Sequence, residues 1–308
     1  MPDIVISEFM DEAIARETLA DFDLVYDPTL VDDRDALLAS LADARAIVVR
    51  NRTIVDQELL DRGPHLKVVG RLGVGLDNID LAACQQRGVA VCPATGANDL
   101  AVAEYVITAA FVLLRQAWQA NNEMIAGKWP RTQLIGCEAA GKRLGLIGLG
   151  SIAREVAARA RALGMSVAAF DPYVPADEPI WNVVDAASLP DLASQCDVIS
   201  VHVPLTDETR NLVDAEFIAG MRDHAMLINT ARGGVINEAA LIDALRNGRL
   251  GGAALDVFES EPLDAAAGAA FGDLPNLLLT PHIAGITAEA NLRVSRVTAQ
   301  NVADHLRR

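Results

Sequence analysis

The segment 148–153, which reads Gly-Leu-Gly-Ser-Ile-Ala, has the residue types and spacing of a turn that binds phosphate groups. It follows an apolar run at 143–147, typical of a buried strand, and opens a stretch at 151–163 that is typical of a helix. At a strand-to-helix turn, free amide groups and the helix dipole favour a pyrophosphate. Gly148 permits the tight turn, and Gly150 lets the phosphate approach the backbone. The segment therefore predicts a dinucleotide site.

An acidic residue follows at the distance that such a site requires. The apolar run 167–170 predicts a second strand, and Asp171 comes directly after it. Its carboxylate can accept hydrogen bonds from a ribose diol and would repel a 2′-phosphate. Because no arginine closely follows Asp171, the pattern favours NAD over NADP.

Three later strands are each followed by a side chain suited to proton transfer or to anion binding. These strands are predicted at 225–229, 252–255 and 277–279. The polar side chains that follow them are Arg232, Asp256 with Glu261, and His282. Because the carboxyl ends of parallel strands meet at one edge of a sheet, we expect these side chains to converge there.

These residue types suit the oxidation of a secondary alcohol beside a carboxylate. His282 is the expected general acid/base, because an imidazole titrates near working pH. Glu261 can hold one ring nitrogen and stabilise the imidazolium, and Arg232 offers two parallel donors to a carboxylate. Nicotinamide would supply the hydride chemistry. The alternatives are structural: a loop-bridging Arg232, a solvated Glu261, and a His282 that only caps a strand.

The other histidines lack this context. His202 follows a buried strand and is a candidate to line the cofactor site. The remaining three are expected in turns or at the surface, and they are His65, His224 and His305.

The elements that must position these residues alternate between strands and helices, which predicts parallel sheets. In the first hundred residues the predicted strands lie at 4–6, 24–26, 46–49, 68–69 and 89–91, and the helices at 11–20, 33–41, 56–62 and 80–87. After residue 143 the pattern restarts, with strands at 144–148, 166–170, 197–201, 225–229, 252–255 and 277–279. The fold class is therefore α/β, with two doubly wound parallel sheets.

A long helical stretch at 99–126 connects the two halves, and the last helix, 287–307, is expected to return to the first half. This predicts a discontinuous substrate domain, 1–98 plus 286–308, and a cofactor domain at 99–285. The apolar surplus of the connector suggests contact with another subunit. Trp118 and Trp129 either belong to that interface or are ordinary core aromatics.

The composition is that of a globular protein: 51% of the 308 residues are hydrophobic and 22% are charged. The formal charge of −16 argues against a nucleic-acid partner and fits either a salty cytoplasm or ordinary solubility. No apolar run is long enough for a membrane span, and the start lacks a signal peptide, so we expect a cytoplasmic protein. No metal site is expected, because the cysteines lack metal-ligand spacing and are interpreted as buried free thiols: Cys84, Cys92, Cys137 and Cys196.

Five ordered motifs make the chain resemble the D-isomer-specific 2-hydroxyacid dehydrogenase family over essentially its full length. They read GKRLGLIGLG at 141–150, HVPLT at 202–206, NTARGG at 229–234, ALDVFESEP at 254–262 and TPHIAG at 280–285. The resemblance implies a Rossmann cofactor domain inserted in a flavodoxin-like substrate domain, and a homodimer formed through 99–130. It also implies that Arg232, Glu261 and His282 are catalytic. Formate dehydrogenases of this superfamily pair the histidine with an amide, so Glu261 favours hydroxyacid chemistry.

The glycine turn and the resemblance together define the expected NAD contacts. They are Val74, Gly148, Gly150, Ser151, Ile152, Asp171, His202, Pro204, Thr230, Ala231, Asp256 and Gly285. Among them, Asp256 is implied to lie near the nicotinamide amide.

The segment 71–80 looks most like the corresponding loop of 3-phosphoglycerate dehydrogenases, here in a short form. The substrate contacts that this implies are Arg50, Asn51, Arg71, Gly73, Gly75 and Arg131. Several guanidinium groups in an acidic protein suggest a small 2-hydroxy or 2-oxo acid with a second anionic group, a phosphate or a sulfonate. An (S)-sulfolactate dehydrogenase-like activity fits the same charges. Asp99 departs from the family pattern, which often has a small hydroxyl there, and the alternative for Arg50 and Arg71 is a salt-bridging role.

Two other functions remain open at this point. One is the reduction of glyoxylate or hydroxypyruvate. The other is an NAD-sensing scaffold, since the resembled family includes corepressors that bind NAD and partner peptides. Those proteins carry extra tails, whereas the folded pattern here begins at Ile4 and ends near Arg307.

Overall fold

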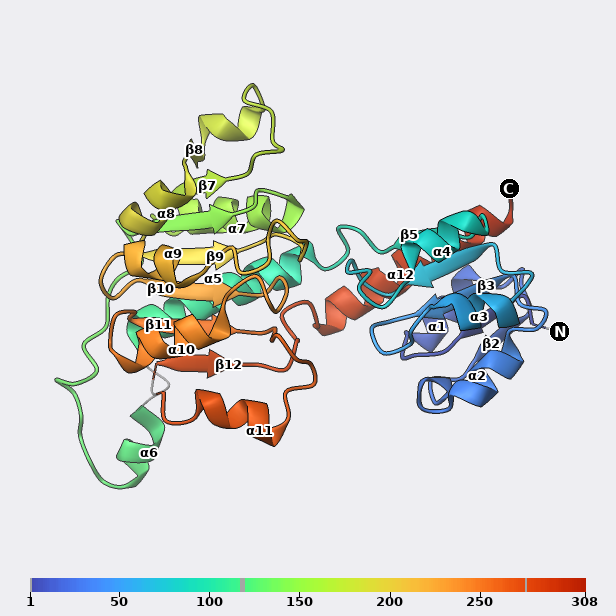
Figure 1. Cartoon of the computed structure of the whole chain (residues 1–308), viewed down its shortest axis with the longest axis horizontal. Coiled ribbons are helices and arrows are strands. Elements are labelled where there is room, and N and C mark those ends of the chain that lie inside the picture. The colour runs from blue at the N-terminus through green and yellow to red at the C-terminus, as the bar shows by residue number, and fades with distance from the viewer. Residues whose placement is uncertain (1, 117–119, 275) are drawn as a thin grey trace. The chain divides into compact units, whose positions relative to one another are not determined.

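The computed structural model describes residues 2–116, 120–274 and 276–308. It contains two compact units, each built around its own parallel sheet (Figure 1). The first comprises the residues up to Asn98 together with Ile286–Arg308, and the second comprises Asp99–Gly285. The two parallel sheets with alternating helices confirm the predicted α/β fold class.

The first unit has a five-stranded sheet in the order β2-β1-β3-β4-β5, which is the flavodoxin-like order. Its strands are β1 (Ile4–Ile6), β2 (Leu24–Tyr26), β3 (Ala46–Val49), β4 (Val68–Arg71) and β5 (Ala90–Pro93). Its helices are α1 (Glu12–Thr18), α2 (Arg34–Ser40), α3 (Gln57–Arg62), α4 (Leu81–Gln86) and α12 (Ala288–Leu306), with a short 3-10 helix at Leu30–Asp32.

The strands β1 and β3 of this sheet are apolar at every position because both of their faces are covered. Along β3, Ile47 and Val49 belong to one hydrophobic cluster, while Ala46 and Val48 belong to the cluster on the opposite face. All four are fully buried. This burial explains why the strands appear in the sequence as continuous apolar runs.

Aspartate caps fix the starts of the helices that cover this sheet. The side chain of Asp11 accepts a hydrogen bond from the backbone amide of Ile14, which supplies a partner for one free amide of α1. The helices α2, α3 and α4 begin in the same way, at Asp33, Asp56 and Asp80.

Helix α12 brings the end of the chain back onto the sheet of the first unit. It begins after Thr287, whose hydroxyl caps the amide of Ala290. Gly70 of β4 allows this packing, because a Cβ there would lie 2.6 Å from Val302 and 3.0 Å from Thr298. A larger side chain at position 70 would therefore push the helix away from the strand.

The second unit has a seven-stranded sheet in the order β12-β11-β10-β9-β6-β7-β8. Its strands are β6 (Arg143–Ile147), β7 (Ser166–Phe170), β8 (Asp185–Ala186), β9 (Val198–Val201), β10 (Met226–Asn229), β11 (Gly252–Leu255) and β12 (Leu277–Leu279). Its helices are α5 (Asp99–Arg115), α6 (Ala120–Ile125), α7 (Ser151–Ala162), α8 (Leu189–Gln195), α9 (Ala215–Gly220), α10 (Glu238–Arg246) and α11 (Ala265–Gly268), with 3-10 helices at Pro179–Asn182 and Ala269–Phe271. The order is that of a Rossmann sheet extended by one strand, β12.

The expected single helix at 99–126 is wrong, because the structure ends α5 at Arg115 and starts α6 at Ala120. Gln116 has a φ of 52°, a left-handed conformation that cannot continue a right-handed helix. The apolar stripe of α5 faces the core of its own unit, where Val106 and Leu113 are buried. Trp118, one of the two tryptophans considered for an interface, lies outside the described residues.

The expectation that all four cysteines are buried is also wrong. Cys84 and Cys196 are buried and Cys92 is half-buried, but Cys137 is exposed. It lies in a segment after α6 that has no regular secondary structure. Within residues 2–116, 120–274 and 276–308, no helix is long and apolar enough to span a bilayer, and no metal-binding cluster of His, Cys, Asp or Glu is found.

Candidate active site

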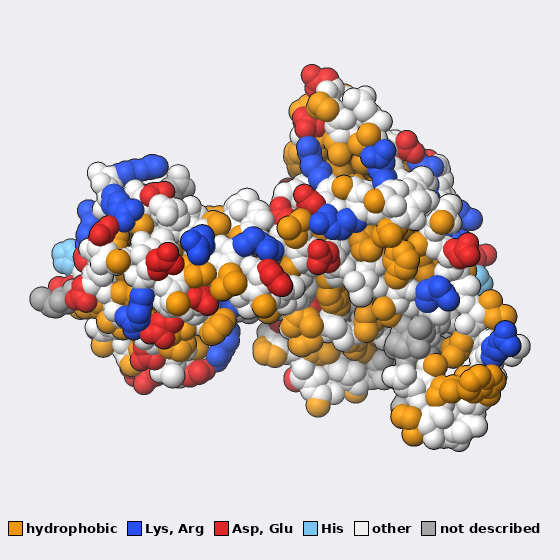
Figure 2. All heavy atoms as spheres, turned by 180° about the vertical axis from the view of Figure 1, so that it is seen from behind, with side chains coloured by type: hydrophobic (Ala, Val, Ile, Leu, Met, Phe, Trp, Pro, Cys, Tyr) orange, Lys and Arg blue, Asp and Glu red, His pale blue; other side chains and the backbone are white. Residues whose placement is uncertain are grey.

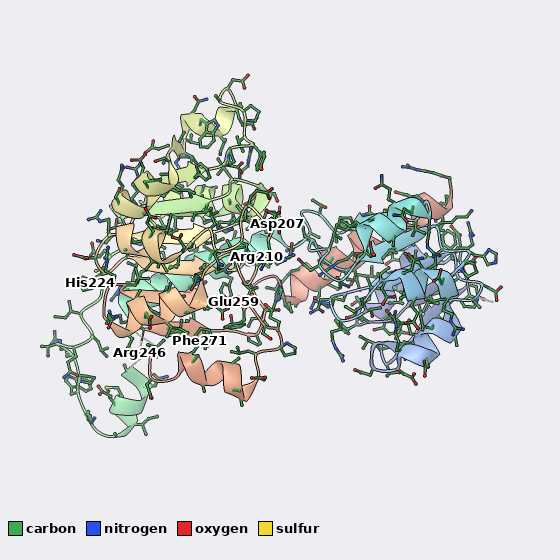
Figure 3. All side chains as sticks on the ribbon, viewed as in Figure 1. Asp207, Arg210, His224, Arg246, Glu259 and Phe271 are labelled. Carbon is green, nitrogen blue, oxygen red and sulfur yellow. The ribbon has the colours of Figure 1, made fainter. Side chains whose placement is uncertain are left out.

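The polar residues of the second unit gather at the carboxyl edge of its sheet. Figure 3 shows Asp207 and Arg210, from the loop after β9, at the same end of the sheet as Glu259 from the loop after β11. His224, in the turn before β10, lies at the opposite end. The sequence interpretation that separated His224 from the site therefore agrees with its position.

His282 and Glu261 form a hydrogen-bonded pair at this edge. Nδ1 of His282 lies 2.7 Å from Oε2 of Glu261, and Oε1 of Glu261 accepts a hydrogen bond from the Phe258 amide at 3.0 Å. Burial acts to raise the pKa of Glu261, but the hydrogen bonds from His282 and Phe258 outweigh it, so that pKa lies below its ordinary value. With Nδ1 bound to the carboxylate, Nε2 is the ring nitrogen left for proton exchange with a substrate.

Asp256 holds the loop that carries His282. Its side chain is only 1% exposed and accepts hydrogen bonds from the amides of Ile283 and Ala284, both at 2.8 Å. Its backbone carbonyl accepts the amide of His282 at 2.8 Å. Thr280 donates its hydroxyl to Oδ1 of Asp256 at 2.6 Å. In the structure Asp256 thus braces the histidine loop, and its contact with a nicotinamide amide stays a prediction.

Arg232 lies in a tight turn after β10 that reaches the loop after β11. The side chain of Asn229 braces this turn, because it donates to the carbonyl of Arg232 at 2.8 Å and accepts the amide of Ala231 at 3.0 Å. Gly233 permits a close approach, since a Cβ there would lie 1.8 Å from the carbonyl oxygen of Phe258. The charge of Arg232 also contributes to the lowered pKa of Glu261. The structure thus brings Arg232, Glu261 and His282 to one place.

The glycine turn has the geometry that a pyrophosphate needs. Gly148 has a φ of 93°, and a Cβ there would lie 2.7 Å from the carbonyl oxygen of His202, so only glycine fits without strain. At Gly150 an added Cβ would meet open space, and no side chain caps the start of α7 at Ser151 and Ile152. The amide groups at this helix start are therefore available to an anion.

Asp171 supports the same turn from the end of β7. Its Oδ2 accepts the amide of Leu149 at 2.8 Å, and its Oδ1 accepts the amide of Tyr173 at 2.9 Å. The carboxylate therefore lies beside the glycine turn, as the sequence spacing predicts. Its role toward a ribose stays a prediction.

Two buried polar atoms at the neighbouring strand ends lack a hydrogen-bond partner among the described residues. They are Nε2 of His202, after β9, and Oγ1 of Thr230, after β10. Burial lowers the pKa of His202 to about 4, so its imidazole is neutral at pH 7. Unsatisfied polar atoms in the interior are costly, so these two atoms fit a bound polar ligand that would complete them. The residues present therefore fit a dinucleotide.

The geometry of the remaining predicted cofactor residues does not indicate a ligand as directly. Pro204 is exposed after β9, Ala231 lies in the Arg232 turn, and Gly285 is half-buried at the end of the second unit. Val74 is 38% exposed and belongs to the first unit. Their contacts with NAD stay predictions.

Arg50 follows β3 in the first unit, and its guanidinium is held by neutral acceptors. Nη2 donates to Oδ1 of Asn291 at 3.0 Å, and Nη1 lies 3.5 Å from the carbonyl oxygen of Phe9. The side chain of Glu8 is 4% exposed and accepts the amides of Arg50 at 2.7 Å and Thr53 at 2.9 Å. Burial lowers the pKa of Arg50, and the nearby charge of Glu8 opposes this. Glu8 thus fixes the loop that presents Arg50.

Arg71 ends β4, the strand beside β3, so both arginines lie at the carboxyl edge of the five-stranded sheet. Nη1 of Arg71 donates to the carbonyl of Leu72 at 2.8 Å. Gly73 has a φ of 142°, and a Cβ there would lie 1.8 Å from Nη1 of Arg71, so a side chain at this position would displace the guanidinium.

The other predicted substrate residues are placed as follows. Asn51 is exposed beside Arg50, and Gly75 is half-buried in the loop after β4. Arg131 belongs to the second unit, in the segment after α6, and is exposed. Their contacts with a substrate stay predictions.

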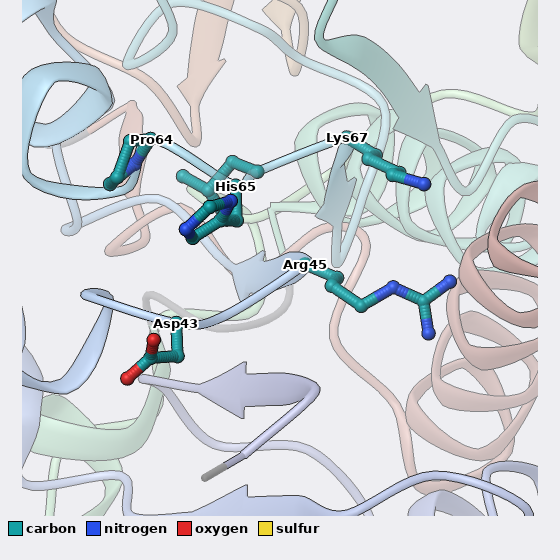
Figure 4. A pocket seen from close by; sticks show the side chains of 6 residues that line it. Asp43, Arg45, Pro64, His65 and Lys67 are labelled. Carbon is teal, nitrogen blue, oxygen red and sulfur yellow. The ribbon is translucent and has the colours of Figure 1, made fainter.

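A surface pocket of the first unit lies away from these arginines. It is lined by Asp43, Arg45, Pro64, His65, Leu66 and Lys67 (Figure 4). These residues precede β3 and β4, whereas Arg50 and Arg71 lie at the carboxyl ends of the same strands. The pocket is therefore at the amino edge of the sheet and is not part of the predicted substrate site.

Sequence reasoning missed four residues that support the site: Glu8, Tyr105, Thr280 and Asn291. Glu8 and Thr280 had a usable signal, because each closely follows a strand at a carboxyl edge. Asn291 and Tyr105 had no usable sequence signal, because each bonds to a residue far away in the sequence. Asn291 bonds to Arg50, 241 residues away, and Tyr105 bonds to Thr280, 175 residues away.

Comparison with known proteins agrees with this geometry. The family model described as D-isomer specific 2-hydroxyacid dehydrogenase, NAD binding domain, matches residues 107–284. The chain is 52% identical over 303 residues to the (S)-sulfolactate dehydrogenase of Chromohalobacter salexigens, covering 98% of this chain and 97% of that protein. It is 40% identical over 271 residues to the D-3-phosphoglycerate dehydrogenase of Archaeoglobus fulgidus, covering 88% of this chain. The chain spans about half, 51%, of that longer relative.

A solved structure of an enzyme with NAD bound also resembles this chain. The crystal structure of D-lactate dehydrogenase from Aquifex aeolicus, complexed with NAD and lactic acid, matches with a TM-score of 0.85 and 28% identity. The match covers 99% of this chain and 95% of that one. The chain belongs to the D-isomer-specific 2-hydroxyacid dehydrogenase family and is an NAD-dependent oxidoreductase.

Proposed function

We propose that the substrate is a small 2-hydroxy acid with a second anionic group, of the 3-sulfolactate type. The observation that carries this proposal is the pair of arginines, Arg50 and Arg71, at the carboxyl ends of adjacent strands in an acidic protein. Two guanidinium groups at one sheet edge suit the second anionic group of such a substrate, because a guanidinium binds a sulfonate or a phosphate through parallel donors.

The similarity to an (S)-sulfolactate dehydrogenase supports the same substrate. In (S)-sulfolactate the sulfur-bearing carbon outranks the carboxyl group when the descriptor is assigned. Its spatial arrangement is therefore that of a D-2-hydroxy acid, which fits the stereochemistry of the family. A phosphate-bearing acid is the second candidate, supported by the phosphoglycerate dehydrogenase relative.

In this proposal the second unit performs the acid–base chemistry. Nε2 of His282 removes the hydroxyl proton during oxidation and returns it during reduction, while Glu261 stabilises the imidazolium. Arg232 binds the substrate carboxylate and polarises the neighbouring oxygen. When bound, NAD supplies the hydride acceptor. The residues that would hold it are those of the glycine turn, with Asp171, His202 and Thr230.

Two alternatives have less support. Reduction of glyoxylate or hydroxypyruvate leaves the paired arginines without a second anion to bind. An NAD-sensing scaffold has no need of a histidine paired at 2.7 Å with a carboxylate beside an arginine.

We also propose a cytoplasmic homodimer formed through residues 99–130. The support is a set of exposed apolar side chains on and after α6: Met124 is 43% exposed, Ile125 is 85% exposed and Trp129 is 76% exposed. Figure 2 shows hydrophobic side chains on the lobe at the lower right, which carries α6. Exposed apolar surface of this kind is typical of an interface, and free cysteines fit a reducing compartment.

The dimer can be tested by light scattering after size-exclusion chromatography. A mass near twice that of the chain is expected, with Trp129→Asp shifting it toward the monomer. Leu163→Asp is a matched control, because Leu163 is also exposed but lies at the end of α7. A wild-type monomer at micromolar concentration would contradict the proposal.

The substrate is tested by NADH oxidation with sulfopyruvate, phosphohydroxypyruvate, hydroxypyruvate, glyoxylate and pyruvate at matched concentrations. A kcat/KM for sulfopyruvate that is well above those of the singly charged acids is expected. Equal or greater activity with glyoxylate or hydroxypyruvate would overturn the assignment, and a preference for phosphohydroxypyruvate would replace the sulfonate by a phosphate. NAD binding without turnover of any acid would favour the scaffold.

A further inference from the structure

We infer that Tyr105 and Thr280 are positioning residues for the reaction, because they hold the His282 loop through a hydrogen-bond chain that ends on Asp256. The chain runs from the phenol of Tyr105 on α5 to the hydroxyl of Thr280 and from there to Oδ1 of Asp256. All of these residues belong to the second unit. The inference rests on the proposed role of His282 as the acid/base.

The number of hydroxyl hydrogens fixes which group donates at each step of this hydrogen-bond chain. Thr280 has one hydroxyl hydrogen, which it donates to the Asp256 carboxylate at 2.6 Å. Its oxygen must then accept the hydroxyl hydrogen of Tyr105. Burial raises the pKa of Tyr105, so the phenol remains protonated and able to donate at neutral pH. The half-buried Tyr105, packed against the core of its unit, is therefore a fixed starting point for the chain.

The Asp256 end of the chain acts directly on the backbone around His282. The carboxylate accepts the amides of Ile283 and Ala284, and the backbone carbonyl of Asp256 accepts the amide of His282. Thr280 is the only one of these carboxylate donors that brings a side-chain hydroxyl. If the Asp256 side chain lost its hydrogen bond from Thr280, it would hold these backbone amides less firmly. The loop around the proposed catalytic histidine would then be less well fixed.

The backbone of His282 needs this support. Its φ is 56°, a left-handed conformation that is uncommon for residues other than glycine and persists only where the surroundings impose it. The side chain must at the same time keep Nδ1 within 2.7 Å of Glu261. A small change in the loop would move Nε2 relative to the substrate, and proton transfer is sensitive to such displacements.

Three variants separate positioning from mere stability. Tyr105→Phe and Thr280→Val remove the hydroxyls with little change of shape, and Thr280→Ser keeps the hydroxyl. With sulfopyruvate and with glyoxylate, we expect Tyr105→Phe to lower kcat about 3- to 10-fold and Thr280→Val somewhat more, the range of one lost hydrogen bond. The dissociation constant of NADH, measured by fluorescence, should change less than about 2-fold, and Thr280→Ser should restore kcat.

Further variants make the outcome decisive. Tyr26→Phe is the matched control, because its phenol donates to a backbone carbonyl, that of Met10, in the other unit, and its kcat should equal that of the wild type. In Tyr105→Phe/Thr280→Val, the loss should equal that of Thr280→Val alone, because both changes break one chain. Wild-type kcat in Tyr105→Phe and Thr280→Val, or a Thr280→Ser variant as slow as Thr280→Val, would overturn the inference. If His282→Ala retained full activity, the proposed acid/base role would fail as a separate result.

Discussion

Oε2 of Glu261 lies 2.7 Å from Nδ1 of His282, although the two residues come from loops after different strands. The contact settles which ring nitrogen faces the carboxylate and so leaves the other for the substrate. In the proposed mechanism, this pair performs the acid–base step and Arg232 in the neighbouring turn binds the substrate carboxylate, and all three side chains belong to one unit.

Removal of the imidazole should abolish proton transfer without harming cofactor binding. We expect His282→Ala to lower kcat by about 10²- to 10⁴-fold, the usual contribution of a general acid/base. The dissociation constant of NADH should stay within about 2-fold, because the glycine turn and Asp171 are untouched. Steady-state kinetics and fluorescence titration measure the two quantities. A collapse of NADH binding with intact folding would contradict the assignment.

The Glu261 pair should also make stability depend on pH. Its folded pKa lies below its ordinary value, so the pair contributes stability above an unfolded pKa of about 4.3 and loses it as pH falls through the folded value. Urea unfolding of wild type and Glu261→Gln should therefore differ at pH 7, and the two free energies of unfolding should converge only below pH 4, as the pH falls through the folded value. A difference that grew as the pH fell below about 4.3 would have the wrong sign for a carboxylate whose folded pKa is lowered.

Asp171 should exclude NADP by charge while it braces the glycine turn. Asp171→Asn keeps an acceptor for the Leu149 amide but removes the negative charge. We expect the ratio of kcat/KM for NADH over NADPH to fall about 10-fold or more, the effect of one removed charge a few ångströms away. A matched control is Asp185→Asn, since that carboxylate pairs with Arg143 at 2.9 Å, away from the turn. An unchanged ratio in Asp171→Asn would exclude its role in cofactor choice.

Much of this arrangement could be predicted because the proposed site residues lie in loops that directly follow strands. Arg232, Asp256 and His282 come within a few residues of the ends of β10, β11 and β12, and parallel strands bring those ends to one edge. Asp171 and the glycine turn follow the same rule. Apolar runs locate buried strands well, so the edge and its residues follow from local patterns.

The parts that could not be predicted depend on distant partners or on a single backbone angle. Nothing in the residues around Asn291 indicates that it binds a guanidinium 241 residues earlier. The break between α5 and α6 occurs at Gln116, a residue with good helix propensity, so the pattern of 99–126 suggested one continuous helix. The two-residue β8 is too short to leave an apolar run.

The most informative variant for substrate choice concerns Arg50. Its guanidinium is held by Asn291 and lies near the carbonyl of Phe9, so it is already positioned before a substrate binds. Arg50→Ala should raise the KM for sulfopyruvate about 10- to 100-fold, the range of a lost charge-assisted hydrogen bond, and that for glyoxylate less than about 3-fold. Asn291→Ala should have a smaller effect in the same direction, because it leaves the charge but frees the side chain.

Arg52→Ala is the matched control for this experiment. The guanidinium of Arg52 pairs with Asp32, and both side chains are more than half exposed, so its loss should leave both KM values unchanged. Equal losses for sulfopyruvate and glyoxylate in Arg50→Ala would mean that Arg50 binds the carboxylate common to both acids. A loss for sulfopyruvate alone would mean that Arg50 binds the sulfonate. Both acids carry the carboxylate and the keto oxygen, but glyoxylate has no sulfonate for an arginine to bind.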